Sequence, residues 1–468
     1  MGGVAGSSGG QLWGERLFRA ASAPASLIAA SVLISASLVF LPLVLEWRYL
    51  VLGTLLFSAG AAAVLMGGVA RRLAYFVFLV QISASVVLPL SLYVTVAFMV
   101  FLIPLLIAGG GTGKIDAIPF HKPMVLILAG WIVSLIYVAA FSHSRHTYMH
   151  IYDIYLLLGF GVAYMVFAML RLKYLDVERM VFYIAHSGLF FVGMTLALYV
   201  IKGETDKILS DRFGMSANVN ASFLALYLNM TLSCAIFLAV SGKCSAVRKA
   251  SLLVSAAIQV VAALMTASRG GFIGIGVIAA FYIWRKRSWK LLLVSVAGAA
   301  AAFLTIGQKM VERIANPTIN ELLSDFGRVE LLKAAFKILR DNYYMFGIGM
   351  NNYSLIKFDY GFPAWFDAAR NKGFSSHNTY MELWLGWGIL GLAGWLLFNI
   401  GIIWALFRCR NKELRGVADA VAFALITFLL FGLGDSNIAS YSMMFTYFSL
   451  AGAALFIVTH KPDGALPR

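Results

Sequence analysis

Apolar residues in this chain occur in long continuous stretches, and they do not alternate with polar residues. Many stretches approach the length of about 20 residues that a helix needs to cross the hydrocarbon core of a membrane. Strands of a membrane barrel show an alternating pattern, whereas continuous runs are typical of membrane helices. The pattern therefore predicts an all-α polytopic membrane protein.

The runs can be divided into fourteen spans, or into twelve where abutting runs are merged. The predicted spans are 26–46, 49–69, 73–90, 91–109, 124–141, 149–170, 180–200, 219–240, 251–267, 270–284, 290–307, 382–406, 417–434 and 440–459. The N-terminal segment is too polar and too long for a signal peptide, so we expect the first span to be retained.

Composition agrees with a membrane protein, because 61% of the 468 residues are hydrophobic and only 12% are charged. A soluble protein carries about 25% charged residues. A net charge of +16 would suggest nucleic acid as the partner of a soluble chain. Here the basic residues lie in short loops, so we expect membrane lipids as partners and no nucleic acid. Cys234, Cys244 and Cys409 have no metal-ligand spacing and are interpreted as unpaired.

The placement of lysine and arginine predicts the orientation. Basic clusters occur at 71–72, 171–173, 243–249, 285–290 and 408–415. With fourteen spans and a cytoplasmic N-terminus, all of them fall on the cytoplasmic side, as the positive-inside rule requires. Both termini are then cytoplasmic. The outer side receives the segments 142–148, 201–218, 268–269, 308–381 and 435–439.

Loops as long as the segment 308–381 are uncommon unless they are functional or disordered. We expect this segment to fold, because its apolar positions follow helical spacing: Phe326, Val329, Leu332, Ala335, Phe336 and Leu339. We predict one or two helices on the outer membrane surface that cap an outer-facing cavity. This divides the chain into a membrane bundle at 1–307, the periplasmic loop at 308–381 and C-terminal spans with a short tail at 382–468.

Two arginines are expected at the outer face. Arg212 precedes Asn218 and Asn220, which can cap the next helix. Arg269 lies within a long uncharged stretch, a costly position unless the side chain reaches water or an anion. Its neighbours are Ser268 and Gly270, and the glycines at 270 and 271 would let backbone N–H groups approach a ligand. Contacts with lipid headgroups are the ordinary alternative for both arginines.

His377 is expected just before a membrane helix, in the segment "SSHNTYMEL". Thr379 and Glu382 fit a capping box, with Thr379 as the N-cap. The positive end of that helix disfavours a protonated ring, so His377 is a candidate general base. A polar surface histidine is the simpler alternative.

Three further polar groups remain ambiguous. Arg328 is a possible anion ligand or a partner of Glu330 or Glu321 in a surface ion pair. Asp435 can orient a base or a sugar hydroxyl, or simply form a turn. His146 and His150 lie four residues apart, but without a cysteine or a His-Glu-x-x-His pattern they are interpreted as loop histidines.

Together these residues suggest a chemistry. Arginine binds phosphate oxygens with two parallel hydrogen bonds, and a polyprenyl pyrophosphate places its phosphates at the membrane surface. If a glycan is attached to that pyrophosphate, the arginines stabilise the leaving group and a histidine activates the attacking hydroxyl.

In its ordered motifs the chain resembles the O-antigen ligase family, which shares a superfamily with the O-antigen polymerases. The matching features are Arg212 followed by Asn218 and Asn220, the Ser268-Arg269-Gly270 sequence, and His377-Asn378 before a helix. The resemblance covers about 205–400, and Val219 stands where the family often has proline.

The resemblance implies a GT-C-like inner-membrane glycosyltransferase of lipopolysaccharide biosynthesis. The donor would be undecaprenyl-pyrophosphate-linked O-antigen, and the acceptor a sugar hydroxyl of the lipid A core on the periplasmic side. His377 would be the base, Arg212 and Arg269 the pyrophosphate ligands, and Arg328 a weaker candidate. The reaction would invert the anomeric carbon, with no cofactor and no metal.

Three alternatives remain. An O-antigen polymerase joins lipid-linked repeat units, and a protein O-oligosaccharyltransferase uses a polypeptide acceptor. A transporter of lipid-linked sugar belongs to another class, which typically shows two related halves with broken helices. No such repeat is visible in this sequence.

Overall fold

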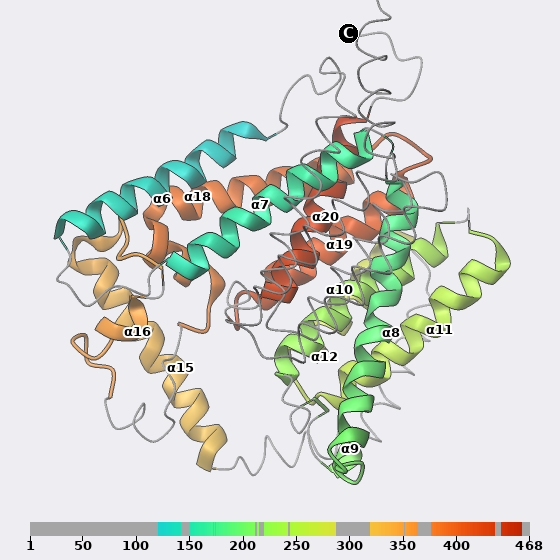
Figure 1. The fold of residues 1–468 in the computed structure, drawn as a ribbon, viewed down its shortest axis with the longest axis horizontal. Coiled ribbons are helices and arrows are strands. Elements are labelled where there is room, and N and C mark those ends of the chain that lie inside the picture. Colours follow the sequence, from blue (N-terminus) through green and yellow to red (C-terminus); the bar gives the residue numbers. More distant parts are fainter. Residues whose placement is uncertain are drawn as a thin grey trace, which may run out of the picture.

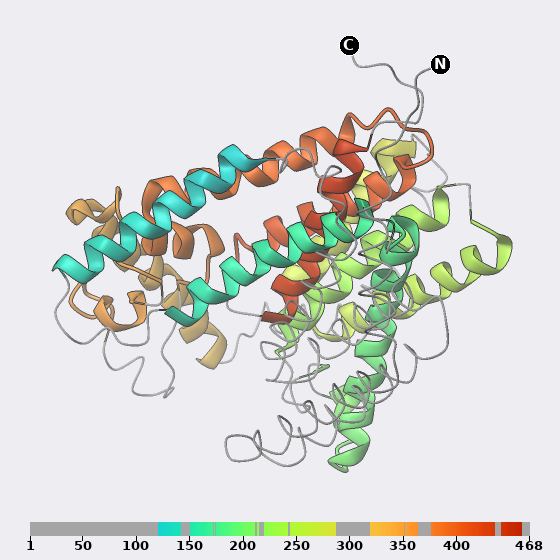
Figure 2. The same ribbon diagram turned by 45° about the horizontal axis from the view of Figure 1, so that its top comes forward.

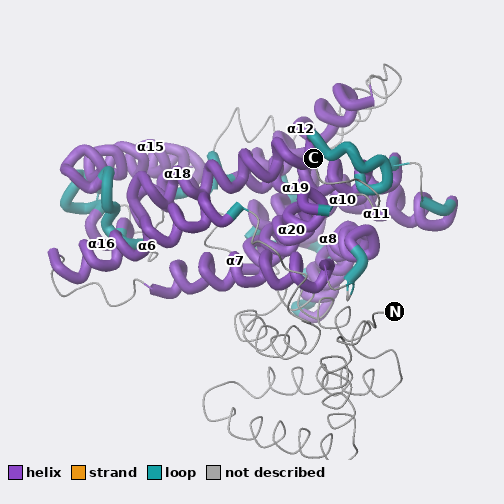
Figure 3. Tube along the Cα trace, turned by 90° about the horizontal axis from the view of Figure 1, so that it is seen from above, coloured by secondary structure: helices purple, strands orange, loops and turns teal. Residues whose placement is uncertain are grey.

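In the computed structural model, helices are the only regular secondary structure of the described residues. The described residues are 120–141, 150–171, 173, 175–210, 213–214, 220–241, 244–286, 319–350, 352–363, 376–435 and 441–460. The predicted spans before residue 119, and the one at 290–307, lie outside these ranges. Figure 3 shows helices joined by short loops, without a strand, over the described residues.

The helices follow the predicted spans closely. They are α6 (His121–Phe141), α7 (His150–Arg171), α8 (Val177–Ile201), α9 (Lys207–Ser210), α10 (Ala221–Val240), α11 (Ala246–Met265), α12 (Arg269–Lys286), α15 (Ile319–Ile338), a π-helical turn η2 (Leu339–Tyr343), α16 (Tyr353–Ile356), α18 (Thr379–Phe407), α19 (Arg415–Phe431) and α20 (Tyr441–Thr459).

Four of the described helices are long and apolar enough to cross a membrane by themselves, namely α8, α10, α11 and α18. Shorter apolar helices accompany them at Lys122–Val138, Gly159–Arg171 and Met443–Thr459. These features confirm an all-α polytopic membrane protein. The division of the chain at residues 307 and 381 stays a prediction.

The bundle has two parts joined by α19 and α20 (Figure 1). On one side α10 packs against α8, α11, α12 and α19. On the other side α6 lies along α18, and α7 lies along α20. Figure 2 shows the same pairings after rotation, so they do not result from overlap in one view.

Glycine allows the closest of these approaches. A Cβ atom at Gly130 of α6 would lie 2.5 Å from the backbone nitrogen of Gly391 in α18. A Cβ atom at Gly452 of α20 would lie 2.4 Å from the carbonyl oxygen of Ala163 in α7. Membrane helices associate through such small residues, because lipid offers no hydrophobic driving force between helices.

The segment that begins with α15 and continues through α16 forms a small folded unit with a core of its own. Leu331, Ala335 and Ile338 of α15 pack with Tyr353 and with residues of α18 that include Met381 and Leu385. We call residues 319–363 the cap.

The predicted apolar stripe of the cap helix is only partly correct. Ala335 and Leu339 are buried, whereas Phe326, Val329 and Phe336 are 47%, 51% and 55% exposed. The buried side of α15 is set by the core that it shares with Ile348, Tyr353 and Phe362 of the cap, which its own periodicity does not reveal.

The cap is joined to α18 by a break in that helix at Gly388, whose φ is +65° and ψ is −170°. Because of the break, the carbonyl of Leu385 accepts a hydrogen bond from the Ile348 N–H at 2.6 Å, and the N–H of Ile389 donates to Tyr344 at 3.1 Å. In an unbroken helix these two groups would bond to each other. The cap therefore satisfies backbone groups that the break releases.

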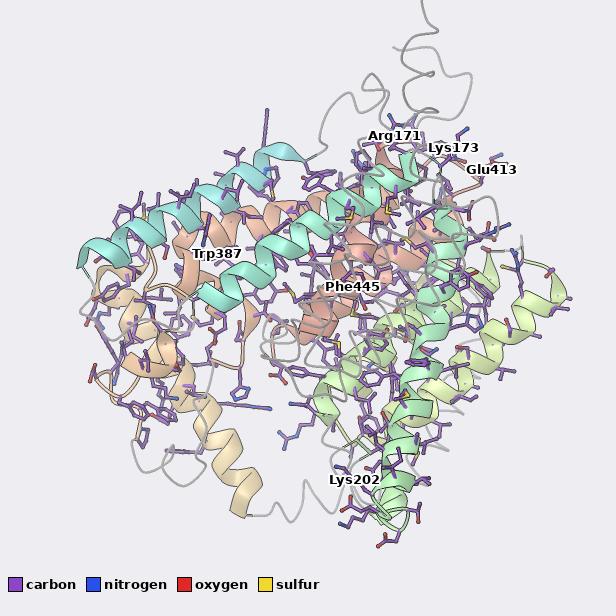
Figure 4. All side chains as sticks on the ribbon, in the orientation of Figure 1. Arg171, Lys173, Lys202, Trp387, Glu413 and Phe445 are labelled. Atoms are coloured by element: carbon purple, nitrogen blue, oxygen red, sulfur yellow. The ribbon has the colours of Figure 1, made fainter. Side chains whose placement is uncertain are left out.

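Charged residues near the helix ends lie at two opposite ends of the molecule. Figure 4 places Arg171, Lys173 and Glu413 at one end of the view and Lys202 at the other. The first three belong to or flank loops predicted as cytoplasmic, and Lys202 belongs to a loop predicted as periplasmic.

Candidate functional site

His377 lies in a tight turn immediately before α18. Its φ is +52°, a left-handed conformation that is uncommon for a residue with a side chain. Such a conformation persists only where surrounding contacts hold it, and it clusters at functional sites. The side chain is 29% exposed, so the ring can reach solvent or a ligand.

The ring of His377 contacts Asp435, which lies just after α19. The Nδ1 atom of His377 and the Oδ1 atom of Asp435 are 3.3 Å apart. When Nδ1 carries the hydrogen and donates it to Asp435, the lone pair of Nε2 is left to accept a proton. This arrangement of a carboxylate behind an imidazole orients the ring of many general bases.

The predicted capping box is wrong in its residues. The N-cap of α18 is Asn378, whose side chain accepts a hydrogen bond from the Met381 N–H at 3.0 Å. Thr379 is the first helical residue, and its N–H donates to the carbonyl of Gly432 at 2.8 Å. Asparagine and threonine are both good N-caps, so local sequence did not distinguish them.

Asn378 and Thr379 tie the start of α18 to the end of α19. The Asn378 Nδ2 atom donates to the Leu433 carbonyl at 2.9 Å, and the Thr379 hydroxyl donates to the Asp435 carbonyl at 3.1 Å. These bonds fix the turn that carries His377 against the turn that carries Asp435.

Glu382 is a residue whose role the sequence did not reveal. Its side chain is only 6% exposed, and its carboxylate accepts a short hydrogen bond from the Ser376 N–H. The capping-box pattern called attention to Glu382 but predicted a bond to the N-cap residue. The sequence signal that could have indicated this role was the presence of an acidic residue in the otherwise apolar first turn of the helix.

The Ser268-Arg269-Gly270 sequence begins α12, as the predicted hairpin requires. Ser268 is buried and its carbonyl accepts from the Phe272 N–H at 3.2 Å, while Arg269 is exposed at the first helical position. The N-terminus of a helix favours anions, so a phosphate is compatible with this location.

The glycines of this motif allow close helix packing, and their predicted approach to a ligand stays a prediction. A Cβ atom at Gly270 would lie 2.7 Å from the ring of Phe431, and one at Gly271 would lie 3.1 Å from the Cβ of Ala225. Asn229 also holds this turn, because its Nδ2 atom donates to the Gly271 carbonyl at 3.1 Å.

The end of α19 therefore connects the two motifs. Phe431 contacts the start of α12 at Gly270, Gly432 contacts Thr379, and Asp435 contacts His377. Motifs more than one hundred residues apart in the sequence meet at this one turn. His377 and Arg269 therefore lie at the same end of the bundle.

The remaining predicted site residues have different outcomes. Asn220 is the N-cap of α10, and its side chain accepts from the Ser222 N–H at 2.9 Å, as expected. Arg328 lies on α15 in the cap and is partly buried. Arg212 and Asn218 lie outside the described residues.

Fold and site together define a multi-pass helical membrane protein with a polar site at the helix ends, where the turns before α18 and after α19 meet. The family model described as O-antigen ligase matches residues 254–396. The family resemblance predicted from the sequence is thereby confirmed over this segment. It includes Ser268-Arg269-Gly270 and His377-Asn378, whereas Arg212 and Asp435 lie outside it.

A curated relative is the teichuronic acid biosynthesis protein TuaE of Bacillus subtilis (strain 168). The two sequences are 24% identical over 214 residues, which is 41% of this chain and 42% of the relative. The match thus spans less than half of the relative's length.

Proposed function

We propose that the protein is a glycosyltransferase that transfers O-antigen polysaccharide from undecaprenyl pyrophosphate to a sugar hydroxyl of the lipid A core. The observation that carries this proposal is the 3.3 Å contact between His377 and Asp435, beside the start of α12 with Arg269. The family match supports a glycosyltransferase-like role on lipid-linked polysaccharide.

In the proposed reaction, Nε2 of His377 removes the proton of the acceptor hydroxyl while Asp435 holds Nδ1. The hydroxyl oxygen attacks the anomeric carbon from the face opposite the pyrophosphate. A new carbon–oxygen bond forms, the bond to the pyrophosphate breaks, and the configuration inverts. The electron pair leaves on undecaprenyl pyrophosphate.

Arginine stabilises the leaving group in this scheme. Arg269 at the N-terminus of α12 is the first candidate, and Arg212 and Arg328 are further ones. A guanidinium and a helix N-terminus both favour phosphate oxygens, and they can take the part that a divalent cation has in other glycosyltransferases. We therefore propose a metal-independent reaction without a cofactor.

The site would face the periplasm, with both termini cytoplasmic and the chain in the inner membrane. The basic clusters and the separation of Arg171 and Lys173 from Lys202 support this orientation (Figure 4). Asn218, Asn220 and Ser268 would shape the periplasmic turns around the donor, and the cap would cover the site.

A second candidate is a polymerase that joins lipid-linked units. The relative is named for the biosynthesis of teichuronic acid and not of O-antigen, so this similarity does not favour the lipid A core as the acceptor over a lipid-linked unit. Both reactions need a base and a pyrophosphate ligand, so they differ only in the acceptor.

The test uses the purified protein with lipid-linked O-antigen and lipid A core, with and without EDTA. We expect glycan transfer that survives EDTA and is lost in His377→Ala. The matched control is His460→Ala, since His460 follows α20 at the predicted cytoplasmic end. Glycan growth on the polyprenyl carrier without lipid A core would establish the polymerase instead. Movement of the donor across a vesicle membrane without transfer would establish a transporter.

A further inference from the structure

The cap and the turn of His377 meet at one buried carboxylate. Glu382 is only 6% exposed at the beginning of α18, where an acid needs close partners because removal of a charge from water is unfavourable. Its first partner is the backbone N–H of Ser376, the residue directly before His377.

A further partner comes from the cap. Lys357 is completely buried, and the Glu382 carboxylate interacts electrostatically with His377 and, less strongly, with the ammonium group of Lys357. The same ammonium lies 5.1 Å from the ring centres of both Phe358 and Phe362. Aromatic faces attract cations, so these rings help to keep a charged lysine in a site without water.

Tyr353 is the third cap residue at this point. It is 1% exposed and its hydroxyl donates to the Leu331 carbonyl at 2.5 Å. Burial, and to a lesser degree the charge of Glu382, raise the pKa of Tyr353 above its ordinary value. The hydroxyl therefore stays protonated, and among the described residues of the cap Lys357 is a buried cation.

The turn that carries His377 needs this support. A residue at φ +52° stores backbone strain that its surroundings must offset. The α19 side supplies the bonds of Asn378 and Thr379. The bond between Ser376 and Glu382 supplies the other side.

We propose that Glu382 is a positioning residue, which holds the His377 turn in its left-handed conformation and is itself held by Lys357 of the cap. The catalytic base is then aligned only when the cap is docked on α18. This inference rests on the proposed function, and it adds two residues that do not touch the substrate.

The test measures kcat and donor KM for variants of the full-length protein. We expect Glu382→Ala to lower kcat by about a hundredfold, since small misplacements of a reacting group have effects of that order. Donor KM should stay within about twofold of wild type, because Glu382 does not bind the pyrophosphate. Glu382→Gln should retain more activity than Glu382→Ala, since its amide oxygen can still accept the Ser376 N–H.

Lys357 provides the second arm. Lys357→Met leaves Glu382 buried without its cation and should lower kcat. The double variant Lys357→Met/Glu382→Gln should be more active than Lys357→Met alone, because both charges are then absent. Matched controls are Lys333→Met and Glu330→Gln, whose 2.7 Å ion pair lies on α15 with Lys333 exposed. Both should retain wild-type kcat.

The outcomes separate the two claims. If wild type transfers glycan and His377→Ala does not, but folded Glu382→Ala and Glu382→Gln both keep wild-type kcat, the positioning role is wrong. A rise in donor KM at unchanged kcat would also overturn it. If wild type transfers no glycan to any acceptor, the proposed function itself is wrong.

Discussion

Nδ1 of His377 lies 3.3 Å from Oδ1 of Asp435, and the two residues are 58 positions apart in the sequence. The contact joins the turn before α18 to the turn after α19. We predict that Asp435→Asn lowers kcat, because an amide can donate to Nδ1 and stabilise the wrong tautomer.

The decrease should not exceed that of His377→Ala, which removes a general base with a contribution of about 10²–10⁴-fold. Initial rates of glycan transfer at saturating donor measure it. Asp359→Asn on the exposed surface of the cap is the control and should behave as wild type. Unchanged kcat in Asp435→Asn would mean that Asp435 only forms the turn.

Arg269 is expected to act through donor binding. Arg269→Ala should raise donor KM by about ten- to a hundredfold, the loss of one hydrogen-bonded charge. Arg269→Lys should recover only part of it, because an ammonium lacks the planar pair of donors. Arg248→Ala, an exposed arginine at the predicted cytoplasmic end, should leave KM unchanged. If the donor KM of all three variants equalled that of the wild type, Arg269 would not bind the donor.

Asn378 has two roles that substitutions can separate. Asn378→Ala loses the N-cap of α18, which stabilises the protein by about 1 kcal/mol, and also the bond to Leu433. Asn378→Asp keeps the cap acceptor but loses the Nδ2 donor. We expect both variants to lose activity and only Asn378→Ala to lower the thermal midpoint clearly. A wild-type rate in Asn378→Asp would show that the Leu433 bond does not position His377.

Gly388 is expected to be essential for docking the cap. Its backbone conformation is accessible essentially to glycine alone, and a Cβ atom there would lie 2.1 Å from the Met345 carbonyl oxygen. Gly388→Ala should destabilise the protein by about 2 kcal/mol or more, measured by thermal unfolding in detergent. Gly276→Ala in α12 is the control, since no atom lies within 4 Å of its added Cβ. A Gly388→Ala midpoint equal to that of the control would contradict the proposed docking.

The orientation can be tested by labelling. In a background with Cys244→Ser and Cys409→Ser, we expect Lys202→Cys to react with an impermeant maleimide in cells with a permeable outer membrane. Val247→Cys, at an 80% exposed position, should react only after the inner membrane is opened. Cys234 is completely buried and should stay silent in both cases. The reverse labelling pattern would place the site in the cytoplasm.

The sequence by itself determined the helices and the two motifs. Runs of apolar residues set where α8, α10, α11 and α18 lie, because lipid leaves every backbone group to be satisfied within its own helix. The costly Arg269 and the polar turn at His377 stood out against that background for the same reason.

Only the tertiary structure decided what these residues touch. Asp435 reaches His377 through helix packing that no local pattern encodes, and the Glu382 carboxylate accepts from the Ser376 N–H and not from the N-cap residue. The break of α18 at Gly388 is likewise stable only because Ile348 and Tyr344 of the cap take over its backbone bonds. Hydropathy reports the transfer of single segments into lipid, whereas these contacts depend on which segments share a face once they are there.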